Sequence, residues 1–406
     1  MNQESSLAGQ SGADGIGAVR AAERWPLPDL LRGAAIVGIL CVNMQDFAGY
    51  DEWTQRGPDR AAQVLIDLLL NGKFISLFAL LFGAGMLAIF ERAGSLQAGA
   101  LRLLRRLLLL LLLGLLHALL LWHGDIISLY ALTGLALVPA LLLRPPTWLL
   151  ALSGGALGLW WLALRCLDAL AAPDAPRWSF VESLASGSSY AELVRGRLGT
   201  LLPDLLANWS YNAPWLAALF LLGMAAQRSG LLARPQRFTA FLRPLLALGV
   251  GLGLPLSLLL AWLNTRASEL AGLWEVPVRL GGGLLLGLGY AAGAALLLAA
   301  GRTGRLRVFA AAGRLALSNY LGQSLVMTTL FFPYGFQLYR QAGALSCLLL
   351  ALLLGALQLR LSRLWLRRWS QGPLEAGLRR LVYGAGQGWS VHGSGRASRP
   401  ESGGPS

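Results

Sequence analysis

Long apolar runs separated by short polar gaps dominate this 406-residue chain. Ten runs are long enough to cross a bilayer as helices, which takes roughly 17–25 residues each. The predicted spans are 30–48, 66–90, 103–122, 126–143, 147–166, 213–228, 242–263, 280–300, 308–331 and 342–364. Because backbone polar groups must be satisfied internally within lipid, these runs predict helices and exclude an open sheet. The pattern therefore predicts an all-α, polytopic transmembrane bundle of about ten helices.

Arginines collect in alternate gaps between the apolar runs. The gaps at 92–106, 228–243, 302–314 and 360–380 are rich in arginine, whereas the gaps on the other side of the bundle hold far fewer. Because cytoplasmic loops carry the excess of Lys and Arg, this bias predicts that both termini are cytoplasmic. The short polar break at 122–125 then falls on the outer face.

The polar regions outside the spans predict a simple domain organisation. Residues 25–383 form a single transmembrane bundle, and the Gly/Ser-rich segments 1–24 and 384–406 predict disordered tails. The one sizeable polar insertion is an outer-face loop at about 167–212. Within it, residues 190–206 have the pattern of an amphipathic helix that lies along the membrane surface.

Composition supports the membrane class and removes several alternatives. The chain is 55% hydrophobic and 13% charged, with a mean hydropathy of +0.57. Its net charge of +14 sits in the gaps between spans, so it indicates topology and no nucleic-acid partner is expected. Three histidines and three cysteines without ligand spacing predict neither a metal site nor a disulfide framework. The sequence also lacks P-loop, dinucleotide-binding and serine-hydrolase motifs.

The polar break at 122–125 places a histidine beside a carboxylate. An imidazole acts as a general base when a carboxylate fixes its tautomer, so His123 is a candidate base oriented by Asp125 or Asp46. The residue types alone slightly favour a plainer interpretation, an interfacial histidine with a helix cap at Asp125. His117 lies about one and a half turns deeper on the preceding helix.

Further polar residues lie in or beside other apolar runs. Asn43 either bonds to a neighbouring helix or lines a site, and we weigh the two about equally. Lys73 either snorkels to the interface or contacts a substrate. The ninth run holds Ser318, Asn319, Tyr320, Gln323 and Ser324. These are too many hydrogen-bonding groups for a lipid-facing helix, so this run must face the bundle interior or a wet cavity.

Several of these segments together resemble the YeiB-like family of bacterial inner-membrane proteins, which carries a domain of unknown function. The matching pieces are Leu31-Arg32-Gly33, Val42-Asn43, Gly72-Lys73-Phe74, His123-Gly124-Asp125-Ile126, Gly313-Arg314-Leu315-Ala316-Leu317-Ser318-Asn319-Tyr320 and Gly372-Pro373-Leu374-Glu375. They occur in the family's order and span nearly the whole chain. The resemblance implies a multi-pass protein of the bacterial inner (cytoplasmic) membrane.

That family is similar to transmembrane acyltransferases such as the lysosomal heparan glucosaminide acetyltransferase. Such proteins move an acyl group from cytoplasmic acyl-CoA to a hydroxyl or amine on the far face. The resemblance places Asn43 at that enzyme's functional asparagine. The enzyme's catalytic histidine lies in the loop after the first helix, whereas the corresponding loop here, 49–59, contains no histidine. His123 is therefore a candidate substitute.

The leading hypothesis is a membrane-embedded acyltransferase that takes acyl-CoA from the cytoplasm and acylates a sugar or lipid at the outer face. The candidate catalytic residues are His123, Asp125 and Asn43. The candidate substrate-binding residues are Arg32, Asp46, Lys73, Arg314, Ser318, Asn319, Tyr320 and Gln323. The candidate ligands of the acyl-CoA phosphates are Arg102, Arg105, Arg106, Arg305 and Arg307. The rivals are a small-metabolite transporter and a non-catalytic envelope scaffold.

Overall fold

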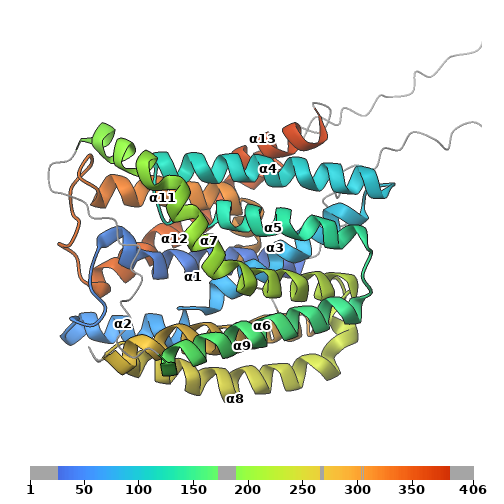
Figure 1. The fold of residues 1–406 in the computed structure, drawn as a ribbon, viewed down its shortest axis with the longest axis horizontal. Helices are drawn as coiled ribbons and strands as arrows, with labels where there is room; N and C mark the ends of the chain where they lie inside the picture. Colours follow the sequence, from blue (N-terminus) through green and yellow to red (C-terminus); the bar gives the residue numbers. More distant parts are fainter. Residues whose placement is uncertain (1–25, 172–188, 266–268, 303, 305, 385–406) are drawn as a thin grey trace, which may run out of the picture.

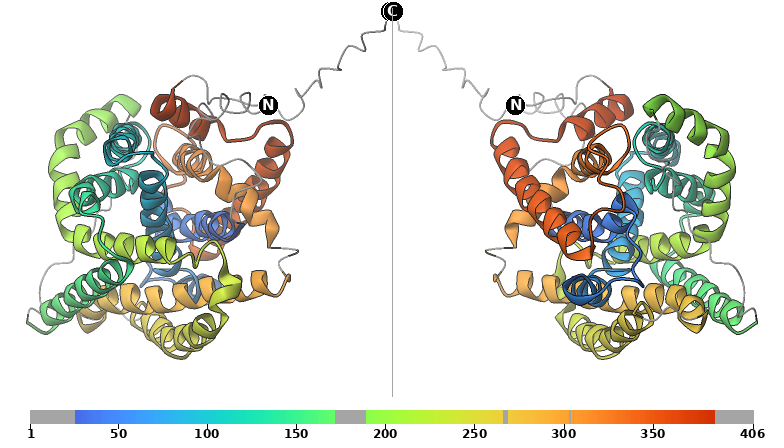
Figure 2. Two further views of the ribbon diagram at one scale, coloured as in Figure 1. Left: turned by 90° about the vertical axis from the view of Figure 1, so that its right-hand side faces the viewer. Right: turned by 90° about the vertical axis from the view of Figure 1, so that its left-hand side faces the viewer.

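The chain folds into a bundle of helices (Figures 1 and 2). The computed structural model describes residues 26–171, 189–265, 269–302, 304 and 306–384, so nearly all of both predicted tails lies outside the described residues. The helices are α1 (Pro26–Ala48), α2 (Gly57–Leu69), α3 (Lys73–Glu91), α4 (Leu96–Leu120), α5 (Ile127–Leu142), α6 (Thr147–Ala171), α7 (Tyr190–Arg228), η2 (Pro235–Phe238), α8 (Thr239–Leu263), α9 (Glu269–Ala299), α10 (Arg307–Arg314), α11 (Ala316–Phe331), α12 (Ala344–Arg368) and α13 (Pro373–Tyr383).

The long helices have the length and composition of membrane spans. Within the described residues, seven helical segments are long and apolar enough to cross a bilayer, with α2 and α3 taken as one segment and α5 as a shorter apolar helix. The seven segments are Pro26–Ala48, Gly57–Glu91, Leu96–Leu120, Thr147–Ala171, Pro235–Leu263, Leu273–Ala299 and Ala344–Arg368. The all-α membrane bundle is confirmed, and every predicted span lies largely within helix.

Two of the predicted spans are interrupted in the structure. The span predicted at 66–90 breaks at Gly72, whose φ of +81° lies in the left-handed region that glycine tolerates. A Cβ at Gly72 would come within 2.3 Å of the Arg279 carbonyl oxygen, so the break also lets α9 approach. The span predicted at 308–331 breaks at Leu315, between α10 and α11.

The insertion predicted at 167–212 is more helical than expected. At one side α6 continues to Ala171, and at the other α7 begins at Tyr190, while residues 172–188 lie outside the described part of the chain. Ser189 and Glu192 form a reciprocal capping box that fixes the start of α7. The amphipathic helix predicted at 190–206 is therefore present, but it continues without interruption into the sixth predicted span.

A tight helix crossing packs α1 against α10, which is far from it in the sequence. A Cβ at Gly33 of α1 would come within 1.8 Å of the Phe309 carbonyl oxygen, and a Cβ at Gly313 of α10 would come equally close to the Asp29 carbonyl oxygen. Only glycine allows two helix backbones to approach this closely. The crossing places Arg32 and Arg314, the neighbours of these glycines, at the same end of the bundle.

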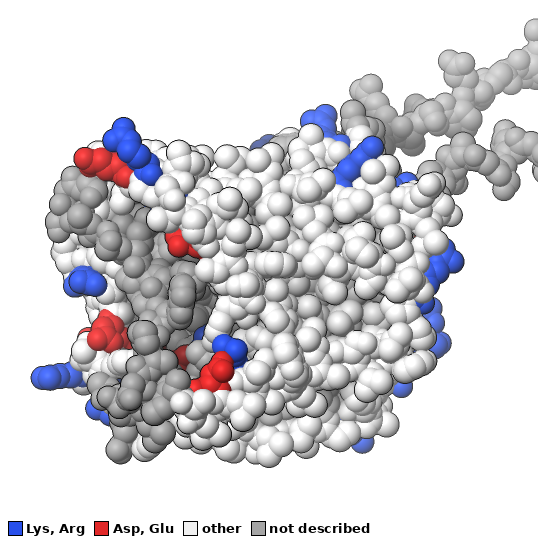
Figure 3. Space-filling model, in the orientation of Figure 1, with Lys and Arg blue, Asp and Glu red and all other residues white. Residues whose placement is uncertain are grey.

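The charged side chains are segregated on the visible face of the molecule (Figure 3). A broad uncharged band occupies the middle, basic groups alone mark the right-hand edge, and the visible acidic groups gather towards the left together with further basic groups. An uncharged band between two charged ends is the arrangement expected of a protein whose helices span a bilayer. We therefore treat the arginine-rich end as cytoplasmic and the other end as the outer face.

Candidate functional site

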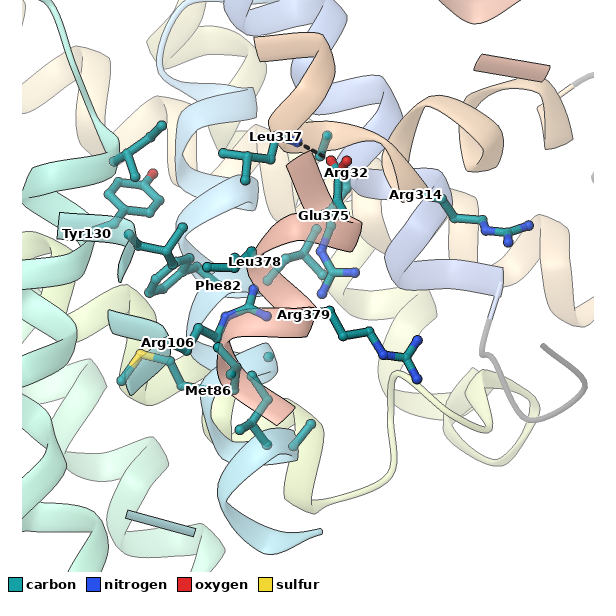
Figure 4. A pocket seen from close by; sticks show the side chains of 18 of the residues that line it. Arg32, Phe82, Met86, Arg106, Tyr130, Arg314, Leu317, Glu375, Leu378 and Arg379 are labelled. Carbon is teal, nitrogen blue, oxygen red and sulfur yellow. Dashed lines mark hydrogen bonds between the residues drawn. The ribbon is translucent and has the colours of Figure 1, made fainter. Parts of the chain in front are cut away.

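A cavity of about 410 Å³ opens among α1, α3, α4, α5, α10, α11 and α13. Its polar lining comes from the cytoplasmic ends of these elements: Asp29, Arg32, Arg92, Arg102, Arg106, Arg314, Glu375 and Arg379. Its deeper lining is apolar and aromatic: Phe78, Phe82, Leu110, Ile126, Ile127, Tyr130 and Tyr320. In Figure 4, Tyr130 and Phe82 lie on one side of the cavity, and Arg314 and Arg379 lie on the other. The cavity thus joins a cationic mouth to an apolar interior.

The arginines at the mouth are held to different degrees. Arg32 pairs with Asp29 at 3.2 Å, and Arg314 donates a hydrogen bond to the Ser370 carbonyl oxygen at 2.6 Å. Arg102 stacks over the ring of Tyr383. For Arg106, the described residues supply neither a hydrogen bond nor an ion pair, although the side chain lines the cavity. Six arginines against two carboxylates make the mouth suited to an anionic ligand.

The carboxylate of Glu375 fixes the wall of the cavity. Its Oε1 accepts hydrogen bonds from the backbone N–H groups of Leu317 and Ser318 at 2.8 and 3.0 Å, and its Oε2 accepts one from the Ser318 hydroxyl. The first N–H groups of a helix need such acceptors, and their positive end favours a carboxylate. The break before α11 is therefore stabilised by α13. Ser318, expected to bind substrate, instead joins these two helices.

Beside the deep end of the cavity lies a buried histidine–carboxylate pair. His117 Nδ1 and Asp125 Oδ1 are 2.8 Å apart, and the two residues are 2% and 4% exposed. Asp125 Oδ2 also accepts the Ser128 N–H and hydroxyl at 2.7 and 2.6 Å. Because a carboxylate accepts, the imidazole proton lies on Nδ1. His117 Nε2 is buried and has no hydrogen-bond partner among the described residues, which leaves its lone pair available as a base.

The partner expected for Asp125 was wrong: Asp125 is committed to His117 rather than to His123. The last turn of α4 directs His117 inward, and the chain then reverses through residues 121–126, with the Trp122 N–H bonded to the His117 carbonyl oxygen. His123 is half-buried on the far side of this turn, where its ring meets that of Trp122. The alternative role of Asp125 as an acceptor at the start of α5 is present as well, through the Ser128 N–H.

A signal for this pair was available in the sequence. His117 lies three residues after Gly114, and a Cβ at Gly114 would come within 2.7 Å of Asp125 Oδ2 and 2.5 Å of the Ser128 nitrogen. A glycine one helical turn before a histidine marks a face where another backbone approaches closely. The sequence pattern points to His123, two residues before Asp125, whereas the histidine that contacts Asp125 is His117, eight residues before it and across the turn.

Tyr320 connects the cavity with the pair. Its side chain lines the cavity, and its ring centroid lies 5.2 Å from that of His117. Its hydroxyl oxygen accepts a long hydrogen bond, 3.5 Å, from the Ile126 N–H. The expectation that Tyr320 faces a site is consistent with this position, and the aromatic ring separates the cavity from His117.

The amides of α11 join helices and do not line the cavity. Gln323 donates a hydrogen bond to Gln358 Oε1 at 2.8 Å, and Asn319 donates one to Ser362 Oγ at 3.0 Å, both on α12. The prediction that this helix faces the interior is therefore confirmed, but the expected central cavity lined by these amides was wrong. Asn43 is half-buried on α1 and likewise lies outside the residues that line the cavity.

Gln323→Leu is expected to lower the free energy of unfolding by about 1–2 kcal/mol, because the Gln358 amide oxygen would lose its donor. Thermal unfolding in detergent measures this loss. The double variant Gln323→Leu/Gln358→Leu is the control, since removing both partners leaves fewer unsatisfied groups than removing one. If the double variant lost more unfolding free energy than the two single variants together, this account would be contradicted.

Lys73 lies in a second buried polar cluster, nearer the outer face. It is fully buried and donates to the carbonyl oxygen of Asp67, so the interfacial, snorkelling position was wrong. The Asp67 carboxylate, also fully buried, accepts hydrogen bonds from Gln63, Asn71 and Asn264 at 2.9–3.2 Å. The three amides thus satisfy the buried carboxylate of Asp67, while its main-chain carbonyl oxygen accepts from the buried ammonium group of Lys73.

The outer end of the bundle gathers further ionisable groups. Asp46, at the end of α1, lies within electrostatic reach of His123 and Arg279. The pKa of Glu52, in the loop after α1, is raised from its ordinary 4.5 to about 8, first by burial and then by the charge of Glu275. Arg279 and a hydrogen bond with Gln45 act in the opposite direction. Asp46 and His123 therefore belong to the outer end, apart from the cytoplasmic cavity.

Glu52→Gln is expected to stabilise the protein increasingly as pH rises. Between about pH 4.5 and 8 the folded protein keeps a proton on Glu52 that the unfolded chain has lost, so the free energy of unfolding falls through this window. Glutamine removes that loss, so the melting temperature of Glu52→Gln should exceed that of the parent at pH 8 and match it at pH 4.5. Asp204→Asn, at an exposed carboxylate of α7, is the control. A larger gain at low pH would contradict the expected sign.

The five arginines expected to bind the acyl-CoA phosphates do not form one site in the structure. Arg102 and Arg106 line the cavity. Arg105 is exposed outside it, and Arg307 lines a separate basic pocket with Arg314, so these two do not join the cavity as expected. Arg305 lies outside the described residues. Successive residues of one helix point in different directions, so a run of arginines in sequence does not form one site.

Comparison with known proteins places the chain in a family. It is 30% identical to "Uncharacterized protein YxaH" of Bacillus subtilis (strain 168), over 87% of this chain and 92% of that protein. It is 33% identical to "Uncharacterized protein YeiB" of Escherichia coli (strain K12), over 86% of this chain and 93% of that protein. The chain belongs to the YeiB-like family. The expected resemblance is thereby confirmed.

A family model described as "Protein of unknown function (DUF418)" matches residues 226–385. That stretch runs from the end of α7 to α13, so it includes Arg314, Tyr320 and Glu375. His117 and Asp125 lie outside it. In this YeiB-like protein, one wall of the cavity is thus within the matched region and the histidine–carboxylate pair is not.

Proposed function

We propose that this YeiB-like protein is a membrane-embedded acyltransferase of the bacterial inner membrane, which transfers an acyl group from cytoplasmic acyl-CoA to an outer-face acceptor. One observation carries the proposal: a cavity with a cationic cytoplasmic mouth ends, at Tyr320, beside a buried His117–Asp125 pair. A phosphate-bearing donor fits the mouth, and its acyl end fits the apolar interior.

In this proposal Arg32, Arg102 and Arg106 hold the phosphates of the donor. These arginines come from α1 and α4, and the described residues leave Arg106 without a hydrogen bond or ion pair. The acyl thioester extends along Phe82 and Tyr130 towards Tyr320. Binding energy at the charged mouth then positions the thioester at the apolar end of the cavity.

The base of the proposed reaction is His117. Its Nε2 takes the proton from an acceptor hydroxyl or amine as the acceptor oxygen or nitrogen attacks the thioester carbonyl carbon. The carbon–sulfur bond breaks, and the thiolate of CoA takes the proton back from the imidazolium. Asp125 holds the proton on Nδ1 and stabilises the transient imidazolium charge. Rotation of the Tyr320 ring opens the path between thioester and imidazole.

Calorimetric titration with acyl-CoA of several chain lengths tests the donor. Arg106→Gln should weaken binding by about 10- to 100-fold, because a charge-assisted hydrogen bond is lost. Arg105→Gln is the matched control: it removes the same charge from the adjacent, exposed position and should leave affinity unchanged. Absence of acyl-CoA binding to the parent protein at every chain length would overturn the proposal.

A second candidate function is a small-metabolite transporter. The observation that favours it is the buried pair of Asp67 and Lys73, since ionisable residues inside a membrane mark ion and substrate pathways. Uptake into proteoliposomes without covalent change of the substrate would support transport. Covalent acylation of an acceptor in the same vesicles would support the first candidate.

A further inference from the structure

A second basic pocket lies on the cytoplasmic side, between α10 and α12. Its volume is about 360 Å³, and its lining consists of Arg307, Ala310, Ala311, Arg314, Arg363, Leu366 and Arg367. Four of these seven residues are arginines, and none is acidic. Such a concave arrangement attracts an anion with several oxygen atoms, and the planar guanidinium groups suit a phosphate.

The surface beside this pocket is apolar. Leu353, Leu357 and Leu364 of α12 are 68%, 49% and 53% exposed. These positions recur at helical spacing on one face of α12. Arg360 lies on the same face between Leu357 and Leu364, and Arg367 of the pocket follows about one turn after Leu364. A lipid-facing leucine stripe therefore leads directly to the arginines of the pocket.

Two tryptophans mark the level of the lipid headgroups. Trp365 and Trp369 lie in and just after the last turn of α12, their ring centroids 6.0 Å apart, and the Trp365 indole donates a hydrogen bond to the Gln371 carbonyl oxygen. Tryptophan is enriched where hydrocarbon meets headgroups. The arginine pocket thus lies at the depth at which phospholipid phosphates are found.

We propose that this pocket binds the phosphate of an anionic phospholipid of the cytoplasmic leaflet, whose acyl chains lie along the α12 leucines. The charge, the concavity and the adjoining apolar stripe match the three parts of such a lipid. Because Arg314 also lines the larger cavity, an occupied pocket fixes α10 beside the mouth of that cavity. The proposal does not depend on the acyltransferase function.

Native mass spectrometry of the full chain, with added phosphatidylglycerol or phosphatidylcholine, tests this inference. We expect selective retention of phosphatidylglycerol, and a loss of about 10- to 30-fold in its affinity for Arg363→Gln/Arg367→Gln. Arg234→Gln/Arg237→Gln is the matched control, since it removes two exposed arginines of the same face outside the pocket. This control should retain the affinity of the parent.

A third variant separates the effect of the guanidinium shape from that of its charge, with a smaller change to the protein than the double variant. Arg367→Lys keeps the charge but loses the planar fork, so its affinity should fall between those of the parent and the double variant. An equal loss in the control pair, or equal retention of the two lipids by the parent, would overturn the proposal. Displacement of the lipid by inorganic phosphate or CoA would also overturn it, because the site would then belong to a soluble phosphate.

Discussion

His117→Asn should reduce acyl transfer by about 10²- to 10⁴-fold, the usual contribution of a general base. The asparagine amide occupies the place of Nδ1 and still donates to Asp125, so the turn at residues 121–126 keeps its hydrogen bond. Only the nitrogen without a partner, Nε2, is removed. The loss should therefore appear in the rate of transfer, with acyl-CoA affinity and thermal stability close to those of the parent.

The measurement is single-turnover transfer from labelled acyl-CoA in membrane vesicles. His123→Asn is the matched control, because His123 lies on the other side of the turn beside Trp122. If catalysis uses His117, this control retains most of the activity. A large loss in His123→Asn with little loss in His117→Asn would restore the interpretation that the linear sequence favoured.

Gly313→Ala should destabilise the protein by about 3 kcal/mol or more. The new Cβ would come within 1.8 Å of the Asp29 carbonyl oxygen, which is backbone and cannot rotate away. Overpacking of this kind forces the helices apart. Since Asp29, Arg32 and Arg314 all line the cavity mouth, separation of α1 and α10 should also weaken acyl-CoA binding.

Thermal unfolding in detergent, with acyl-CoA titration at a temperature where the protein is folded, measures both effects. Gly251→Ala on α8 is the matched control, because a Cβ there meets nothing within 4 Å. That variant should match or exceed the stability of the parent, since alanine favours a helix over glycine. An unchanged melting temperature for Gly313→Ala would show that α1 and α10 do not cross as described.

Apolar periodicity predicts the membrane bundle well, because a span is a local property of about 20 residues. The breaks within spans are less local. The break before α11 depends on Glu375, which lies 58 residues beyond Leu317 and supplies the acceptor for its N–H. A left-handed conformation at Gly72 could be expected because the residue is a glycine. The need for a glycine there comes from the close approach of the Arg279 carbonyl oxygen on α9, which the sequence does not show.

Sequence reasoning found half of the histidine–carboxylate pair. The sequence points to Asp125 because His123 lies two residues before it, yet which histidine Asp125 contacts depends on how the chain turns between α4 and α5. The polar residues of α11 illustrate the same limit. Their burial follows from composition, but only the packing of α12 shows that Gln323 and Asn319 are satisfied by helix partners while Tyr320 meets the cavity.

The contact between Glu375 and α11 has a consequence for biosynthesis. Glu375 is close to the end of the described chain, and it supplies the acceptor for N–H groups in the wall of a cavity begun by α1. A ribosome therefore delivers His117 and Asp125 long before the last piece of their surroundings. A nascent chain that stops short of α13 holds the His117–Asp125 pair without the finished wall, so the proposed acyl transfer is expected only after α13 has packed against α11.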